Sequence, residues 1–99
     1  MAKFDVYRQA GGGPYLLDCQ ADLLSDLNTR FVVPLLAAGD APKPAARLNP
    51  VFRIADDALI MATQFAAAIP KRELGDRIIS LIHEQDAIGN ALDMLISGF

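Results

Sequence analysis

Apolar and polar residues alternate near the start of the chain, as they do in strands that bury one face. The segment from Lys3 to Arg8 places Phe4 and Val6 on one side, and Tyr15 to Gln20 repeats the alternation. Between them, Gly11 to Pro14 reads Gly-Gly-Gly-Pro, which is incompatible with regular structure. We therefore expect a β-hairpin with a flexible, glycine-rich connection.

The middle of the chain predicts further strands. Arg30 to Leu36 is a continuous apolar run, typical of a strand buried on both faces, and Pro34 within it predicts an edge or a bulge because proline cannot donate to the ladder. Val51 to Ala55 predicts a strand, followed by a turn at Asp56-Asp57. From Ala58 to Ile69 the alanines favour a helix and the preceding turn favours a strand, so the pattern leaves this segment open.

The strongest periodic signal lies at the C-terminal end. A polar segment from Lys71 to Asp76 predicts a turn at Gly75, and apolar residues then recur every three or four positions. We expect one amphipathic helix, capped by Ser80 and ending at about Ser97, because Gly98 stands where a left-handed residue follows a helix. Its apolar stripe comprises Ile78, Leu81, Ile82, Ile88, Ala91, Leu92, Leu95 and Ile96, and its polar stripe His83, Asp86, Asn90, Asp93 and Ser97. About five strands followed by one long helix predict a single α+β domain over residues 1–99.

Composition bears on assembly and on partners. Hydrophobic residues make up 53% of the 99 residues and charged residues 21%, against typical values of about 45–50% and 25%. A chain of this size has a limited interior, so we expect a homodimer to bury the surplus. The net charge of -3 disfavours direct binding to nucleic acid or to anionic membranes and favours a protein partner with a basic patch.

Residues that could carry chemistry are few. Cys19 is the only cysteine and His83 the only histidine, so we expect no disulfide, no metal site and no cofactor. We expect Cys19 to be a small buried hydrophobe, and His83 to be a solvated helix residue without a positioned catalytic partner. A charge at Lys3 and the lack of any run of about 18 apolar residues predict a cytoplasmic protein without a membrane span. The expected activity is binding rather than catalysis.

Two surface features have both a structural and a functional interpretation. The polar stripe of the expected helix is either a solvated face or a docking surface, and Asp93 is unfavourable near a helix C-terminus because the macrodipole prefers cations there. Phe99 either packs back on Met94 or Leu95 or serves as an anchor for a partner.

Several segments match a known family in order and spacing. They are Phe4-Asp5-Val6-Tyr7, Cys19 to Leu24, Arg30 to Leu35, Leu48 to Phe52, the region from Met61-Ala62-Thr63 to Ile69-Pro70, and His83 to the end with Asn90-Ala91-Leu92 and Gly98. Through them the chain resembles the CcdB-type toxins of bacterial toxin–antitoxin modules over nearly its whole length. The resemblance implies an SH3-like antiparallel β-barrel with a C-terminal α-helix, a homodimer, and strand structure for Ala58 to Ile69.

The resemblance also implies a function and its partners. Toxins of this kind bind the A protein of DNA gyrase (gyrase A), trap the enzyme on cleaved DNA, and are neutralised by a small disordered antitoxin of the CcdA type. Carried over by position, the gyrase-binding residues are Leu23, Leu24, Asp86, Asn90, Asp93, Ile96, Ser97, Gly98 and Phe99. The antitoxin-binding residues are Arg8, Gly11, Gly12, Gly13, Pro14, Asp40, Lys43 and Arg47, within the segments Arg8 to Pro14 and Gly39 to Arg47.

One position departs from the family pattern. Ser97 stands where the family places a tryptophan that is the main anchor on gyrase. The loss of such an anchor typically costs about 2–4 kcal/mol, or roughly 30- to 1,000-fold in affinity. The alternative is therefore a relative that keeps antitoxin binding and has lost or changed its target. A third hypothesis is an endoribonuclease like related barrel toxins, with His83 and Arg30 as the residues to test, since fold does not determine function.

Overall fold

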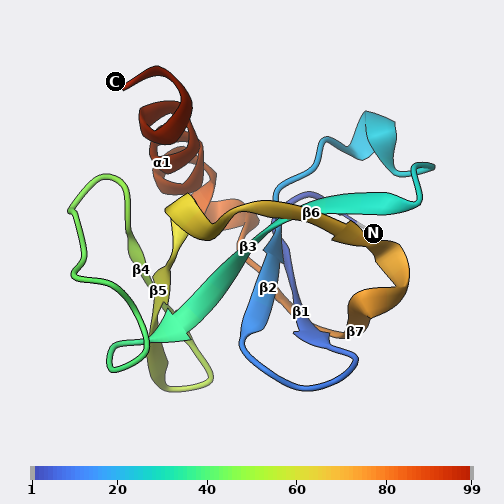
Figure 1. Cartoon of the computed structure of the whole chain (residues 1–99), viewed down its shortest axis with the longest axis horizontal. Coiled ribbons are helices and arrows are strands. Elements are labelled where there is room, and N and C mark those ends of the chain that lie inside the picture. The colour runs from blue at the N-terminus through green and yellow to red at the C-terminus, as the bar shows by residue number, and fades with distance from the viewer. Residues whose placement is uncertain (1, 99) are drawn as a thin grey trace.

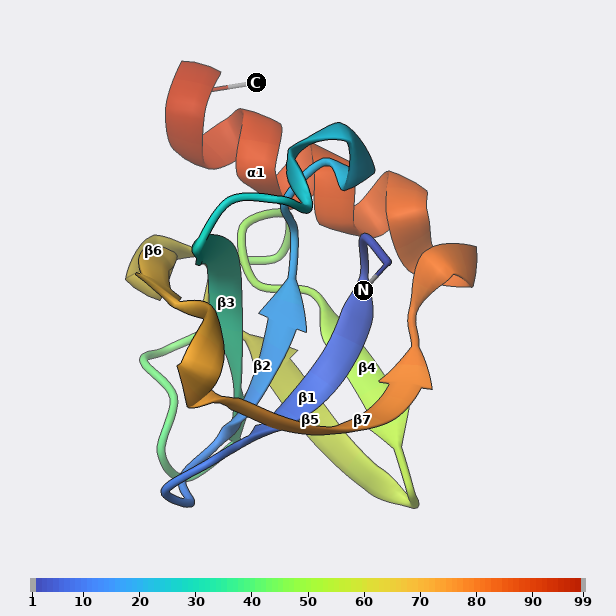
Figure 2. The same cartoon turned by 90° about the vertical axis from the view of Figure 1, so that its right-hand side faces the viewer.

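A strongly curled antiparallel sheet forms most of the molecule, and one helix lies across an end of it (Figure 1 and Figure 2). The computed structural model describes residues 2–98. The strands in that range are β1 (Asp5–Gln9), β2 (Tyr15–Asp18), β3 (Thr29–Ala37), β4 (Val51–Ile54), β5 (Asp57–Met61), β6 (Ala67–Pro70) and β7 (Leu74–Ser80), and the α-helix is α1 (Gln85–Ser97). Short 3₁₀ turns are η1 (Asp22–Leu24), η2 (Thr63–Phe65), η3 (Lys71–Glu73) and η4 (Ile82–Glu84). The expected α+β architecture, an SH3-like antiparallel barrel with a C-terminal helix, is confirmed.

The nine-residue strand β3 organises the sheet. The strand order is β4-β5-β3-β2-β1-β7, and β6 also pairs with β3. The first half of β3 pairs with β6 and the last three residues pair with β5, while β2 runs along the opposite edge. Pro34 lies opposite Leu16 of β2, between the part of β3 that pairs with β6 and the part that pairs with β5. Its carbonyl accepts the Ala62 N–H at 3.0 Å. The irregularity expected at Pro34 is therefore the break between β5 and β6.

The segment from Ala58 to Ile69 contains two strands rather than one. Strands β5 and β6 confirm the strand assignment at its two ends, and the 3₁₀ turn η2 separates them. The buried Thr63 fixes this turn because its hydroxyl donates to the Leu48 carbonyl. The turn before β5 also differs by one residue from the expectation: Ala55 and Asp56 adopt φ of 50° and 71°, typical of a two-residue hairpin loop, and Asp57 already belongs to the strand.

The expected start of the C-terminal helix is wrong. Ile78 lies in strand β7, which pairs with β1 through Val6↔Ile79 and Asp5↔Ser80, and α1 begins only at Gln85. Long-range pairing with β1 prevails over the local spacing of apolar residues, and the turn expected at Gly75 is part of this strand. The Ser80 hydroxyl accepts the Ile82 N–H at 3.2 Å, so Ser80 precedes the 3₁₀ turn η4 and does not cap α1.

The end of the helix is confirmed. Helix α1 ends at Ser97, and Gly98 follows in the left-handed conformation with φ of 79°. The Gly98 N–H donates to the Met94 carbonyl at 3.0 Å, which closes the last turn. Phe99, with the two roles considered for it, lies outside the described residues.

The core lies between the curled sheet and the inner face of α1. Strand side chains such as Val6, Leu17 and Val33 pack with Ile88 and Ala91 of the helix. Asn49 is a buried polar residue that is satisfied by donating to the Met61 carbonyl at 3.0 Å. No helix within residues 2–98 is long and apolar enough to cross a bilayer.

Cys19 belongs to this core, as expected, and its thiol should be inert in the folded protein. Burial raises its pKa to about 12, with the neighbouring Asp18 carboxylate adding to the effect. Because the thiolate is the nucleophile, we expect an aromatic disulfide reagent at pH 8 to label Cys19 in urea and not in buffer. Rapid labelling of the native protein would contradict this burial.

The pKa of the Cys19 thiol is higher in the folded protein than in the unfolded chain. Its contribution to the free energy of unfolding is therefore present below about pH 9 and declines as the pH rises further.

Candidate partner-binding surfaces

The loop that carries η1 presents leucine side chains to solvent. Leu23 is 93% exposed and Leu24 46% exposed, in a segment that is otherwise polar. Leu27 is 49% exposed and extends the same loop, which sequence reasoning missed although it follows Leu24 by three positions. Exposed leucines on a fixed loop are features of a protein-binding site rather than of a core.

Hydrogen bonds fix this loop to three other parts of the chain. The Asp22 carboxylate accepts the Lys3 N–H at 2.7 Å. Lys71 donates its backbone N–H to the Asn28 carbonyl at 2.8 Å and its ammonium group to the Ser25 carbonyl at 3.3 Å. Gln20, at the base of the loop, donates its side-chain amide to the Leu24 carbonyl at 2.9 Å. The exposed leucines therefore stand on an ordered support.

The outer face of α1 carries the predicted polar stripe except for His83, which lies on η4 before the helix. Asp86, Asn90 and Asp93 are all exposed, on the side of the helix opposite the buried Ile88 and Ala91. Ser97 and Gly98 are also exposed at the end of the helix, and Ile96 is 77% exposed. Phe99 lies outside the described residues. The stripe spans about 16 Å from Asp86 to Ser97, because a helix rises about 1.5 Å per residue.

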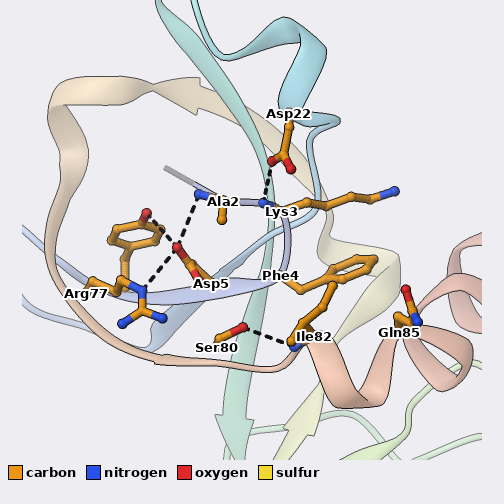
Figure 3. Close-up of a pocket in the computed structure, with 10 residues that line it drawn as sticks. Ala2, Lys3, Phe4, Asp5, Asp22, Arg77, Ser80, Ile82 and Gln85 are labelled. Atoms are coloured by element: carbon orange, nitrogen blue, oxygen red, sulfur yellow. Dashed lines mark hydrogen bonds and ion pairs between the residues drawn. The ribbon is translucent and has the colours of Figure 1, made fainter.

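A pocket of about 740 Å³ joins the beginnings of these two surfaces (Figure 3). Asp22, which precedes Leu23, and Gln85, which precedes Asp86, both line it. Phe4 lies in the wall of the pocket with a φ of 72°, a conformation that L residues rarely adopt. The Phe4 carbonyl accepts a hydrogen bond from the Leu81 N–H at 2.8 Å. The pocket brings together the first residue of η1 and the first residue of α1, each directly before a predicted gyrase-binding residue, whereas Asp93 to Gly98 lie toward the other end of the helix.

A buried carboxylate forms the polar wall of the same pocket (Figure 3). Asp5 accepts hydrogen bonds from the Ala2 N–H at 3.2 Å and the Tyr7 hydroxyl at 3.5 Å, and forms an ion pair with the Arg77 Nε at 3.1 Å. Burial, followed by the nearby Asp5 carboxylate, raises the pKa of Tyr7, because both disfavour the charged phenolate. This network fixes strand β7 against β1 and thereby the start of α1.

The predicted antitoxin-binding residues are divided between two parts of the barrel. The β1–β2 hairpin tip lies at the end opposite α1 (Figure 1 and Figure 2), whereas Arg47 precedes Leu48, whose carbonyl accepts a hydrogen bond from Thr63 of η2, the turn that contacts α1. Gly13, Pro14 and Asp40 line one pocket of about 510 Å³, which the β1–β2 hairpin and the β3–β4 loop build together. Arg8 stacks over the Tyr15 ring at 5.6 Å. The remaining residues of this prediction, Gly11, Gly12, Lys43 and Arg47, are exposed and do not line the pocket.

The two residues considered for nuclease chemistry lie in different environments, one in the core and one at the surface. Arg30 is fully buried and paired with the equally buried Asp18. His83 is exposed on η4. Within residues 2–98 no group of three or more histidine, cysteine or acidic residues could hold a metal ion. The guanidinium of Arg30 is therefore occupied by an ion pair in the core, and His83 is a surface residue.

Comparison with known proteins now identifies the family. The family model described as CcdB protein matches residues 3–98 of the chain. The chain belongs to the CcdB family. The match covers both surfaces described above, including the η1 loop and the whole of α1.

Solved structures extend the likeness of this CcdB-family chain to other toxins. An endoribonuclease from a mycobacterial species, solved with its cognate antitoxin, is 17% identical, with 97% of this chain and 94% of that chain covered and a TM-score of 0.76. The Mycobacterium tuberculosis toxin MazF-mt6 is 13% identical, with 93% and 94% covered and a TM-score of 0.75. At these identities the likeness shows the shared fold alone.

Proposed function

We propose that this CcdB-family chain is the toxin of a type II toxin–antitoxin module. It acts as a homodimer that binds gyrase A and inhibits the topoisomerase, and a CcdA-like antitoxin neutralises it. Family membership over residues 3–98 supports the toxin role. A neighbouring structure that is a toxin in complex with its cognate antitoxin supports the antitoxin as a partner.

The observation that carries the proposal is the fully exposed Leu23 on its fixed loop, beside the acidic start of α1. A large apolar side chain that protrudes from an ordered support is suited to fill a pocket of a partner, because little entropy is lost on binding. Asp86 and Asp93 provide negative charge for approach to a basic surface. Another exposed apolar residue, Phe65, is available for self-association.

The positions of the two predicted surfaces support separate partners. The η1 loop and α1 lie at one end of the barrel, and the hairpin tip with Asp40 lies at the other (Figure 1). An antitoxin bound at the hairpin pocket could engage the toxin while gyrase still covers the η1 surface. This arrangement suits an antitoxin that removes the toxin from its target.

Ser97 supports a second candidate function. It is exposed on the last turn of α1, at the position where the family places its tryptophan anchor. A relative that keeps the fold and the antitoxin surface and has lost or changed its target is consistent with this residue. Nuclease activity is not proposed, because the likeness to endoribonucleases is one of fold and because Arg30 is buried in an ion pair.

Binding to the dimerisation core of gyrase A tests the proposal. We expect micromolar or tighter binding by calorimetry, with inhibition of supercoiling, and a loss of about 30-fold in affinity for Leu23→Ala, as for a hot-spot residue. The urea midpoint should not change, because Leu23 is almost fully exposed. Val51→Ala, at an exposed apolar position on β4, is the matched control and should bind like the wild type. If micromolar wild-type protein neither binds nor inhibits, gyrase is not the target.

A further inference from the structure

The side chain of Gln20 connects the η1 loop to the central strand. Its Nε2 donates to the Leu24 carbonyl at 2.9 Å, and its Oε1 accepts the Phe31 N–H at 2.9 Å. Gln20 is almost completely buried, although glutamine is usually exposed. Both ends of the amide are therefore used, one on the loop and one on β3.

Gln20 is itself held in place by the strands below the loop. Its backbone N–H donates to the Asp18 carboxylate at 3.0 Å, and the other oxygen of that carboxylate pairs with Arg30. The preceding residue, Cys19, donates its N–H to the Phe31 carbonyl at 2.9 Å. A continuous chain of hydrogen bonds thus runs from the buried ion pair through Gln20 to the carbonyl of Leu24.

The position of this bond determines what it can control. Leu24 ends the turn that carries Leu23, and the bonds within the turn are short-range, such as the Ser25 N–H to Asp22 at 3.1 Å and the Leu27 N–H to Leu24 at 3.1 Å. Lys3 holds the Asp22 carboxylate at its start and Lys71 the Ser25 carbonyl after it, and Gln20 holds the carbonyl of its last residue. Such a turn is not stable alone. Fixing its last carbonyl to β3 orders the leucines before a partner arrives, so that less conformational entropy is lost on binding.

We propose that Gln20 is a positioning residue for partner binding: its amide holds η1 so that Leu23 and Leu24 are presented in one fixed arrangement. The proposal rests on the proposed toxin function. The partner that fits is a protein with an apolar pocket and a basic rim, because Asp22 and Asp26 flank the leucines on the same loop. Gln20 acts through the loop and does not touch the partner.

The variant Gln20→Met tests this role, because methionine has a similar length and neither of the amide's polar groups. Native-state hydrogen exchange should show the amides of Ser25 and Leu27 exchanging about tenfold faster, with those of Leu17 and Val33 unchanged. Affinity for the dimerisation core of gyrase A should fall about tenfold. The core variant Ile60→Val in β5 controls for general destabilisation, because Ile60 is buried and lies outside the loop and its support.

A double-mutant cycle distinguishes positioning from a structural role. In the Leu23→Ala, Leu24→Ala background, Gln20→Met should have no further effect on affinity, because the side chains it positions are gone. An equal loss in both backgrounds, or unchanged exchange at Ser25 and Leu27, overturns the proposal. If the wild type binds and Gln20→Met binds equally well, positioning fails and the toxin function stands. If the wild type does not bind, the gyrase proposal fails and the positioning role fails with it.

Discussion

The variant Arg30→Met is expected to lose about 3–5 kcal/mol of the free energy of unfolding. Arg30 and Asp18 are both fully buried, and the Arg30 Nη2 is paired with the Asp18 carboxylate. Removing the guanidinium leaves a buried carboxylate without its counter-charge, which costs far more than the net stability that the intact pair provides. A loss of this size is a large share of the roughly 5–15 kcal/mol that stabilises a domain. Urea unfolding at a fixed protein concentration measures it, since dimerisation would make stability depend on concentration.

A double variant identifies the cause of that loss. Arg30→Met with Asp18→Asn removes the buried charge and keeps an oxygen that can accept the Gln20 N–H, which Asp18 accepts at 3.0 Å. The double variant should be more stable than Arg30→Met alone. The Arg30 Nε and Nη1 have no hydrogen-bond partner in the described part of the chain, so apolar replacement also removes two buried nitrogen atoms whose N–H groups are unpaired. A loss below about 1 kcal/mol for Arg30→Met would contradict the buried pair as a major contributor.

The second large effect is a gain of function: Ser97→Trp should raise the affinity for gyrase A by roughly 30- to 1,000-fold. Ser97 is exposed at the end of α1, directly before the left-handed Gly98, so a tryptophan can be accommodated without repacking the core. The ring would add the aromatic anchor that the family pattern places there and that this chain lacks.

Calorimetry with the gyrase A dimerisation core measures this gain. Ser97→Ala is the control, because it removes the hydroxyl without adding an aromatic surface, and it should bind like the wild type. An unchanged affinity for Ser97→Trp would show that gyrase does not contact the end of α1 in this protein, and it would favour the relative with a changed target.

The alternating strands were predictable because their information is local. The alternation around Val6 and the apolar run from Arg30 correspond to observed strands, and the Gly-rich segment corresponds to the connection between β1 and β2. The expected single buried face was wrong for β1, because Asp5 and Tyr7 are buried as well as Val6, and Phe4 precedes the strand. Strand β7 was not predictable, because Gly75, Asp76 and Arg77 break its pattern and only pairing with β1 makes it a strand. Ile78 and Leu81 stand three positions apart, which local analysis cannot distinguish from a helical stripe.

The candidate surfaces were predictable in part for the same reason. The exposed polar stripe of α1 follows from the local pattern, and the exposed Leu23 was predicted through the family resemblance; the structure shows both to be exposed. That Gly13 and Asp40 meet in one pocket depends on the tertiary fold. The roles of Gln20 and Arg30 were not visible, because polar residues are expected at the surface and only the structure shows that these two are buried. The homodimer and the assignment of each surface to a partner remain predictions.

Expression of the wild-type chain without an antitoxin in sensitive bacterial cells tests the central claim most directly. Soluble wild-type protein should arrest growth, the Leu23→Ala, Leu24→Ala variant at equal abundance should arrest it much less, and co-expression of the cognate antitoxin should restore growth. Normal growth of cells that contain the soluble wild-type protein would contradict the claim that this CcdB-family chain is a toxin.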